Sequence, residues 1–427
     1  MDATPGRLAR MLLPLLLIIA ATPTVTAGTI HVDHAGGGDY LTIQKGIGAA
    51  TYGDTVLVAP GTYYEHLTMG PAADGVTLLG ASGAENTVVS NESTYPYSVL
   101  FCHDLGHDTR VAGMTFDGGY ADLHGGGVRC DSAHVLFEDI VVTNCSALES
   151  HGGGIGAVDS DLTILDSVIQ NNRAGNGGGI SVVGGSMTAT GNELFGNSAD
   201  GVALERWGGG LYIACDGALV HDNHIMGNSA LDGGGIAVSS SAGTTITEST
   251  IKSNSATDRA GAIYLHESDC RAEQNLIIDN YAITTGGGAV DIDLASRHSG
   301  LDRPIFTGNT FHNNSAFGCD AAIRLHDGGL PPEFSGNYFA NTTTYEILVV
   351  TTPTRLTIDF TGNWWGSEDP LEIADKIYDC EDNGGLAWCV DYSDWCDEPS
   401  CGGQATSVDE PGATTPVSWG QLKSIYR

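Results

Sequence analysis

Residues 225–238 read IMGNSALDGGGIAV, and this stretch decides the fold. An apolar residue lies three positions before an Asn, a small residue follows the Asn, and three glycines lead into a short apolar run. Similar copies occur at 168–182 (VIQNNRAGNGGGISV), 194–213 (LFGNSADGVALERWGGGLYI), 251–265 (IKSNSATDRAGAIYL), 277–290 (IIDNYAITTGGGAV) and 311–325 (FHNNSAFGCDAAIRL). A chain that places Gly or Ala at the same step in each copy needs that step in its structure.

The copies are evenly spaced. In four of them the first apolar residue after the glycine step is followed by the next repeat Asn after 17 residues, and from Ile236 to Asn254 the interval is 18. A repeat of about 25 residues with short alternating segments and no helical periodicity is typical of β coils that stack about 4.8 Å apart. Because crossovers between parallel strands are almost always right-handed, the sequence predicts an all-β, right-handed single-stranded parallel β-helix, a solenoid.

The glycines and the asparagines both have structural explanations in such a fold. Each coil must turn sharply into its strand without a β-carbon touching the coils above and below, and Gly also reaches positive φ. The repeat asparagines are expected to stack in a turn and to bond backbone groups. The first Asn column comprises Asn144, Asn172, Asn197, Asn228, Asn254, Asn280 and Asn314, and a second comprises Asn192, Asn223, Asn275 and Asn309.

Composition excludes some partners. The chain has 52 acidic and 17 basic side chains among 427 residues, a formal charge of -35. Phosphate groups would be repelled, so nucleic acid and anionic membrane surfaces are excluded as partners. No segment approaches the roughly 20 apolar residues of a membrane span outside the first residues. We expect a monomer.

The start of the chain predicts export. Arg7 and Arg10 precede an apolar run at 11–21, and Val25-Thr26-Ala27 suits signal cleavage, so residues 1–27 are interpreted as a signal peptide. The β-helix is then expected at 28–366, with an N-terminal cap at 28–60. The protein would be secreted or held at the cell envelope, with outer-membrane association as one option.

The C-terminal part is organised differently. Four of the ten cysteines, Cys380, Cys389, Cys396 and Cys401, gather at 367–401, where a local disulfide-bonded cap is expected rather than a metal site. Cys130, at an inward strand position, is interpreted as a buried thiol. Residues 402–427 are expected to be a flexible tail, and its apolar and basic ending is either a sorting segment or a frayed terminus.

These repeats, together with the two ends, resemble right-handed parallel β-helix proteins with the pectate-lyase-like fold. The segment GGGDYLTIQKGIGAATYGDTVLVAPGTYYEHL (36–67) is similar to their N-terminal cap, with a short helix at 41–50, and TGNWWGSEDPLEIADKIYDCEDNGG (361–385) is similar to a C-terminal closing segment. The apolar-x-x-Asn and Gly-Gly-Gly-Ile pattern also resembles the repeats of polymorphic outer membrane proteins, although Ala replaces Gly in some copies. That second resemblance implies a surface protein.

The resemblance does not supply a catalytic motif. A polygalacturonase-like site would need Gly-His-Gly, and the chain has only Gly106-His107-Asp108. A pectin-esterase-like site would need a Gln-Asp strand motif, which is also missing. Because a fold does not fix a function, candidate residues must come from the strand pattern itself.

Strand alternation supplies candidates. In the strand after the glycine step Ile263 and Leu265 face the core, so the residues between and after them face outward. Stacking then predicts two columns on the last coils. The first column contains His266, Asp293 and His326, and the second contains Tyr264, Asp291 and Arg324 with Tyr212 further along.

An insertion lies beside these columns. From Val290 to Asn314 the interval is 24 residues instead of 17, and the added ASRHSGLDRP is expected to bring Arg297, His298 and Arg303 next to the outward cluster. A second insertion, DGVALERW, precedes the strand at Leu211. Loops that protrude beside a regular coil can form a cleft.

Three functions fit this pattern. The first is a surface or adhesin-type protein that binds a polysaccharide, a surface glycan or another partner, with Tyr212, Tyr264, Arg297, His298 and Arg303 as contacts. The second is a polysaccharide lyase or hydrolase with Asp291, Asp293, His266, His326 and Arg324 as catalytic residues. The third is a scaffold, in which the outward face is ordinary solvated surface. A metal at the His-Asp-His column is the alternative use of those side chains. No metal or other cofactor is assigned. Calcium is left open because the chain is an acidic β-helix expected to be exported, although no Asp-x-Asp-x-Asp-Gly loop occurs.

Overall fold

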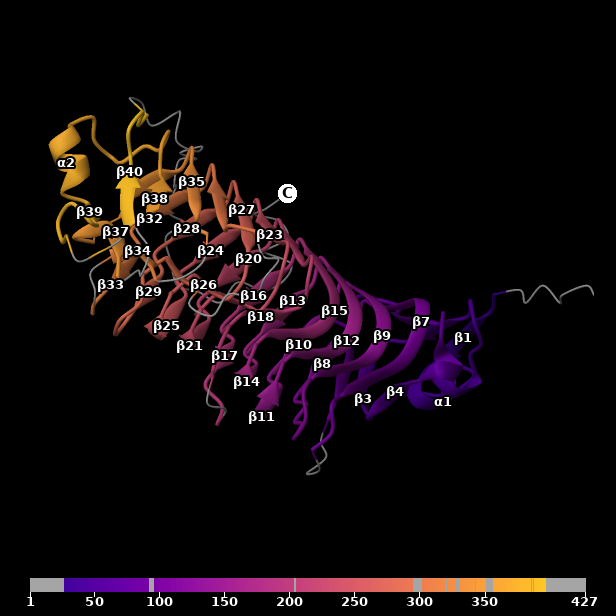
Figure 1. The fold of residues 1–427 in the computed structure, drawn as a ribbon. Coiled ribbons are helices and arrows are strands. Elements are labelled where there is room, and N and C mark those ends of the chain that lie inside the picture. The colour runs from indigo at the N-terminus through magenta and orange to yellow at the C-terminus, as the bar shows by residue number, and fades with distance from the viewer. Residues whose placement is uncertain are drawn as a thin grey trace, which may run out of the picture.

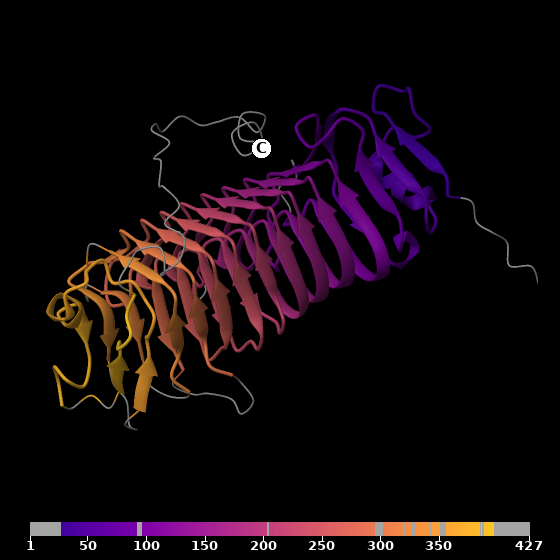
Figure 2. The ribbon, with the colours of Figure 1, turned by 90° about the horizontal axis from the view of Figure 1, so that it is seen from above.

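A computed structural model describes residues 27–91, 96–202, 205–294, 302–318, 321–326, 330–341, 343–350, 356–384, 386 and 388–396. The regular secondary structure in these ranges is almost entirely β-strand, arranged as an elongated stack of coils (Figures 1 and 2). Two short α-helices, α1 (Ile43–Ala49) and α2 (Pro370–Ala374), and one 3-10 turn at Pro71–Ala73 interrupt the strands. No helix within the described ranges has the length and apolar character that a membrane crossing requires.

The strands form three sheets, and the largest has 22 strands. It contains β1 (Thr29–Val32), β2 (Thr55–Val58), β4 (Leu67–Met69), β5 (Thr77–Gly80), β7 (Leu100–Ala112), β9 (Val128–Glu138), β12 (Ile155–Leu165), β15 (Ile180–Thr190), β18 (Leu211–Ala214), β19 (Leu219–His221), β22 (Ile236–Ser239), β23 (Thr244–Thr247), β26 (Ile263–His266), β27 (Cys270–Glu273), β30 (Val290–Asp293), β31 (Ile305–Thr307), β34 (Ala321–Leu325), β35 (Glu333–Ser335), β37 (Tyr345–Val349), β38 (Leu356–Asp359), β39 (Ile377–Tyr378) and β40 (Trp388–Asp391).

The other two sheets take one strand from each successive coil. The 11-stranded sheet contains β3 (Gly61–Tyr64), β6 (Thr87–Ser90), β8 (Thr115–Asp117), β10 (Val141–Thr143), β13 (Val168–Gln170), β16 (Glu193–Phe195), β20 (His224–Met226), β24 (Thr250–Lys252), β28 (Leu276–Ile278), β32 (Thr310–His312) and β36 (Tyr338–Ala340). The seven-stranded sheet contains β11 (Ser146–His151), β14 (Arg173–Asn176), β17 (Ser198–Ala199), β21 (Ser229–Asp232), β25 (Ser255–Arg259), β29 (Tyr281–Ala282) and β33 (Ser315–Ala316).

Every strand pairing in the described ranges is parallel, and residues at the same place in successive repeats are register partners. Ile236 pairs with Ile263, and Ile263 pairs with Val290. Their side chains point into the coil and are fully buried, as is that of Leu265. The prediction of a parallel β-helix with Ile263 and Leu265 facing the core is confirmed.

Each glycine of the step has its own physical reason. Gly233 has a φ of +67°, which side chains other than Gly rarely adopt. At Gly234 a β-carbon would lie 2.3 Å from the carbonyl oxygen of Ser255 in the next coil, so the space excludes any side chain. At Gly235 the nearest atom would be 2.9 Å away, and Ala262 fills the corresponding place one coil later. The third position therefore varies between Gly and Ala.

The Asn columns form two buried ladders of hydrogen bonds. Asn228 Oδ1 accepts from the backbone N–H and the Nδ2 of Asn197, each at 3.0 Å, and Asn228 donates in turn to Asn254 Oδ1. The prediction of stacked asparagines is confirmed, with one correction. Asn144 lies outside the ladder because it is exposed and bonds Asp117; the backbone N–H of Cys145 occupies the ladder position and donates to Asn172 Oδ1.

The ends of the solenoid differ from its middle. Helix α1 packs against β1 and β2 but is only seven residues long, so its action as a cap stays a prediction. Near the other end Cys380 and Cys389 form a disulfide, as expected for the cysteine-containing segment. Cys130 is a buried free thiol, also as predicted. Residues 1–26, Cys401 and the tail at 402–427 lie outside the described residues, and the domain limits stay predictions.

Candidate functional site

The outward columns exist as predicted, but they are not open to solvent. Tyr264 pairs with Asp291, Asp291 with Arg324, and His266 with Asp293. Tyr264 is only 1% exposed and Asp291 is 0% exposed. Interpretation of this face as ordinary solvated surface is therefore wrong for its centre.

The covering comes from the turns that lead into each strand. Tyr212, Ala237, Ala260 and Tyr264 form a small apolar cluster that is separate from the core of the coil. Trp207, from the insertion before β18, packs against this cluster, with its ring 5.7 Å from that of Tyr264. The insertion thus contributes to the site through an aromatic side chain.

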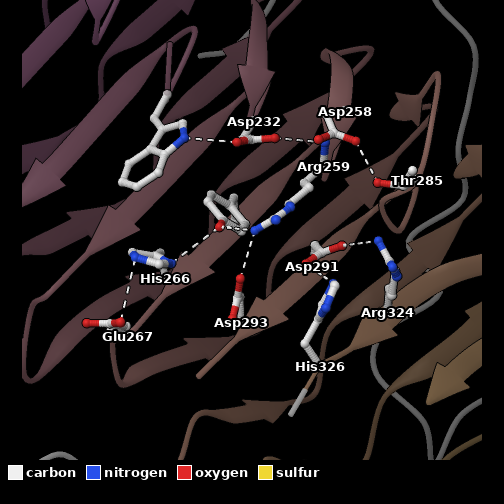
Figure 3. A network of polar contacts seen from close by, with 12 residues as sticks. Asp232, Asp258, Arg259, His266, Glu267, Thr285, Asp291, Asp293, Arg324 and His326 are labelled. Atoms are coloured by element: carbon white, nitrogen blue, oxygen red, sulfur yellow. Dashed lines mark hydrogen bonds and ion pairs between the residues drawn. The ribbon is translucent and has the colours of Figure 1, made fainter. Parts of the chain in front are cut away.

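One half of the site is a closed hydrogen-bond network (Figure 3). Arg259 donates to Asp293 Oδ2 at 2.7 Å and to Tyr264 Oη at 2.6 Å. Asp232 accepts from Trp207 Nε1 at 2.9 Å and from the backbone N–H of Arg259 at 3.0 Å. These bonds fix the guanidinium of Arg259 and the indole of Trp207 in place.

Burial changes the acidity of this half. Asp232 is 6% exposed, and burial raises its pKa to about 6 because the charged form loses its water. Burial also raises the pKa of Tyr264 well above its ordinary value. Tyr264 is therefore a neutral hydrogen-bonding group at neutral pH and not a phenolate base.

The other half of the site is unsatisfied. Asp291 Oδ1 lies 3.1 Å from His326 Nε2, and Asp291 Oδ2 lies 3.9 Å from Arg324 Nη1, close enough for attraction between the carboxylate and the guanidinium. Neither carboxylate oxygen has a hydrogen-bond partner, and the buried Arg324 Nε and His326 Nε2 also have none. Buried polar atoms without partners are rare in folded proteins, because each costs about 1–3 kcal/mol. Four of them lie around one point, where Asp291, Arg324 and His326 contact one another without a hydrogen bond.

His266 lies at the edge between the two halves. Its Nδ1 is 3.4 Å from Tyr264 Oη, and its Nε2 is 3.9 Å from Glu267 Oε1 (Figure 3). Trp207 covers one side of the imidazole, with 5.0 Å between the ring centroids. The structure therefore brings together all five side chains predicted as catalytic, His266, Asp291, Asp293, Arg324 and His326, but Asp293 is held by Arg259 and Asp291 is not hydrogen-bonded.

The predicted ligand contacts have different outcomes. Tyr264 lies in the network, and Tyr212 stacks on His151 two coils away, with 6.1 Å between the ring centroids. Placement of Arg303 beside the cluster is wrong: it faces Glu333 at 3.7 Å and lines a separate cavity with Asp269 and Arg271. Arg303 stands near the end of the insertion, two residues before β31 begins at Ile305. Arg297 and His298 are outside the described residues.

Three residues of the site do not follow from strand alternation after the glycine step. Trp207, Asp232 and Arg259 each stand directly before that step, and they pair side by side in neighbouring coils. Alternation along the following strand carries no information on this position. The available signal is that an otherwise regular repeat changes residue type there from Asn176 through Trp207 and Asp232 to Arg259.

No metal centre is formed by the side chains that the structure describes. Across the described ranges, no group of three or more His, Cys, Asp and Glu side chains is arranged to hold a metal ion. Calcium binding stays a hypothesis from composition. What the arrangement offers is a fixed set of hydrogen-bond donors and acceptors on a sheet face.

Comparisons with known proteins address the fold. The family model described as "Right handed beta helix region" matches residues 69–217 and 206–364, more than half of the chain. Among solved structures, ORF18 of Geobacillus virus E2 is 13% identical with a TM-score of 0.35, covering 69% of this chain and 58% of that one. This chain therefore spans less than two thirds of the length of ORF18.

Two further solved structures are named for sugar polymers. Pectate lyase Pel9A is 11% identical with a TM-score of 0.33, covering 77% of this chain and 79% of that one. The A-module of the mannuronan C-5 epimerase AlgE6 of Azotobacter vinelandii is 16% identical with a TM-score of 0.33, covering 73% and 90%. At such identities and TM-scores we base no functional argument on them. No curated protein sequence matches the chain.

Proposed function

The chain belongs to the right-handed β-helix family, whose fold leaves function to the site, and we propose that this protein is an exported polysaccharide-binding protein. The ligand binds against Arg324 and His326, the partly exposed side chains that lie over the buried Asp291 of β30. Export rests on the signal-like residues 1–27, and envelope attachment is part of the same proposal.

The observation that carries the proposal is the set of unpartnered atoms around Asp291. The carboxylate offers hydrogen-bond acceptors, while Arg324 Nε and His326 Nε2 lie beside it and make no hydrogen bond. A hydroxyl group can donate to a carboxylate and accept from a cation at the same time. A ligand carboxylate or phosphate could accept from Arg324 but would be repelled by Asp291. The site therefore favours a polyhydroxylated ligand, which is the chemistry of a sugar.

The shape of the molecule favours a polymer over a single sugar. Outward columns continue from Tyr212 through Tyr264 to Arg324 along the solenoid, and each coil adds about 4.8 Å. Aromatic rings of Trp207, Tyr212 and His151 accompany the column on its way. Flat apolar rings beside polar groups are suited to the two kinds of surface that a sugar presents.

Polysaccharide cleavage is the second candidate, and the pairing of Asp291 with His326 at 3.1 Å favours it. A carboxylate beside an imidazole can exchange a proton with it, which is the arrangement that general acid and base catalysis uses. Catalysis would require that a bond between two sugar units of the polysaccharide be cleaved at the site. Binding requires only the hydrogen bonds already described.

Asp291→Asn tests the proposal. The amide keeps the shape but removes the charged acceptor, so affinity for the polysaccharide should fall about tenfold to a hundredfold, the value of one hydrogen bond to a charged group. The free energy of unfolding should also fall, because the amide no longer attracts the guanidinium of Arg324 at 3.9 Å, so the folding of the variant is measured separately. Affinity electrophoresis against dextran, laminarin, xylan, galactan, polygalacturonate and alginate measures the first, and urea unfolding measures the second.

Asp269→Asn is the matched control. Asp269 is also a buried carboxylate, but it accepts from the backbone N–H of Gly243 and from that of Asp302 at 2.9 Å. This variant should lose about 1–3 kcal/mol of stability and keep its affinity. Equal affinity of wild type and Asp291→Asn for every polymer that binds would contradict the proposal, as would binding of none. Reducing ends released by wild type alone would favour cleavage.

A further inference from the structure

A cavity of about 400 Å³ adjoins the unsatisfied half of the site. Arg324 forms part of its wall, and the wall continues along the same outward column, because Arg324 pairs with Leu348 and Leu348 pairs with Tyr378. The cavity is therefore the direct continuation of the column that contains Asp291, one and two coils further along.

The far wall of this cavity comes from two residues of the C-terminal segment. Asn383 and Leu386 line it, and both lie within the loop that the Cys380–Cys389 disulfide closes. Asp379 precedes Cys380 and is 3% exposed. Its carboxylate accepts hydrogen bonds from the backbone N–H of Glu381 and of Val390, one near each end of this segment. Asn383 itself donates to the carbonyl of Asp379 at 3.0 Å through its backbone. A ligand that follows the column meets this wall.

The lining of the cavity is about equally polar and apolar. Leu348, Val350 and Leu386 give aliphatic surface, Tyr378 gives an aromatic ring, and Asn383 gives an amide. Arg324 is the one charged side chain among the described residues that line the cavity, and it faces Asp291 at 3.9 Å. An anionic sugar would compete with Asp291 for that charge and would approach a protein with a net charge of -35.

We infer that this cavity is an end subsite that holds the terminal, uncharged sugar unit of the polysaccharide, so that the protein recognises chain ends and not the middle of chains. The inference rests on the proposed function and adds the location of the chain end and the neutral character of the sugar. Asn383 and Arg324 contact its hydroxyls, and Tyr378 and Leu348 contact its C–H face.

Filling the cavity tests this inference. Leu348→Trp and Leu386→Trp each place an indole in the cavity, the first from a strand and the second from the loop, so that one remains informative if the other fails to fold. Each should lower affinity at least tenfold for a neutral polysaccharide that binds wild type among dextran, laminarin, xylan and galactan. Leu330→Trp is the matched control, because it fills the separate cavity that Arg303 and Asp269 line, and it should keep full affinity.

A second measurement tests end recognition. Size-graded fractions of that polysaccharide are compared at equal mass, and wild-type protein bound per gram should rise in proportion to the number of chain ends. Binding that is independent of chain length, or full affinity in both filled variants, would overturn the inference while leaving the proposed function intact. Stronger binding of polygalacturonate or alginate than of every neutral polymer would contradict the inference that the terminal sugar unit is uncharged. If the wild-type protein binds none of the polymers, the proposed function is removed as well.

Discussion

Asp291 and Asp293 are two residues apart on one strand, and their carboxylates have different surroundings. Asp293 accepts from Arg259 at 2.7 Å, whereas Asp291 is fully buried and accepts no hydrogen bond. Alternation along the strand predicts that both point outward, and they do. It could not predict which one is paired, because Arg259 comes from the turn before the previous strand and its long side chain reaches across the coils.

Asp232 gives a prediction for stability against pH. Its pKa is about 6 in the folded protein and about 3.9 in an unfolded chain, so the folded state keeps its proton to higher pH. The folded state then binds more protons between these values, and the free energy of unfolding falls as pH rises through them. The total fall from this group is about 3 kcal/mol, at about 1.4 kcal/mol for each pKa unit.

Asp232→Asn should remove that fall. Urea unfolding from about pH 4 to about pH 7 measures it, and the decline of wild type should be steeper than that of the variant. Asp391→Asn is the opposite control, because hydrogen bonds from Ser393 hold the pKa of Asp391 below its ordinary value. It should lose stability at neutral pH and none in acid. An unchanged slope in Asp232→Asn would contradict the burial argument.

At the scale of the element, the glycine step shows what a repeat pattern can predict. The pattern predicts a turn where a β-carbon clashes, and the structure assigns the clash to the second glycine, with the carbonyls of Ser255 and Gly261 at 2.3 and 2.6 Å from a β-carbon on Gly234. The sequence carries this distinction in part, since Ala replaces the third glycine at Ala262, Ala289 and Ala322, and replaces the second only at Ala321 in the last aligned copy. Position in the pattern, more than the number of glycines, is the informative feature.

Gly234→Ala and Gly235→Ala form a matched pair. The first should lower the free energy of unfolding by about 3 kcal/mol or more, because two backbone carbonyls must move. The second should lower it by about 1 kcal/mol, since Ala262 already occupies the equivalent place in the next coil. Thermal or urea unfolding measures both. Equal losses would mean that conformational freedom alone explains the step.

The Asn ladder marks a limit of the same reasoning. The repeat pattern puts Asn144 in the column because its neighbours in sequence resemble those of the other members. The ladder position needs a backbone N–H that points at the next Asn, and Cys145 provides it. A shift of one residue at the start of a repeat leaves the pattern almost unchanged but moves the side chain from the inside of the turn to the surface.

For the whole molecule, the solenoid turns sequence spacing into spatial order. Residues about 25 apart become neighbours, which is why the repeat spacing alone predicts that Tyr264, Asp291 and Arg324 share one column. Segments that leave the repeat do not obey this rule. Arg303 belongs to one insertion and faces Glu333, and the indole of Trp207 from another insertion covers the site. The repeat spacing therefore cannot place the side chains of insertions, because their path depends on tertiary contacts.

A crystal structure of the protein soaked with an oligosaccharide that it binds tests the central claim most directly. The account predicts a sugar hydroxyl within hydrogen-bond distance of the Asp291 carboxylate, of Arg324 Nε and of His326 Nε2. These atoms make no hydrogen bond in the unliganded site. Sugar bound elsewhere, for example in the cavity beside Asp269 and Arg303, with Asp291 still unpartnered or bonded only to water, would contradict it.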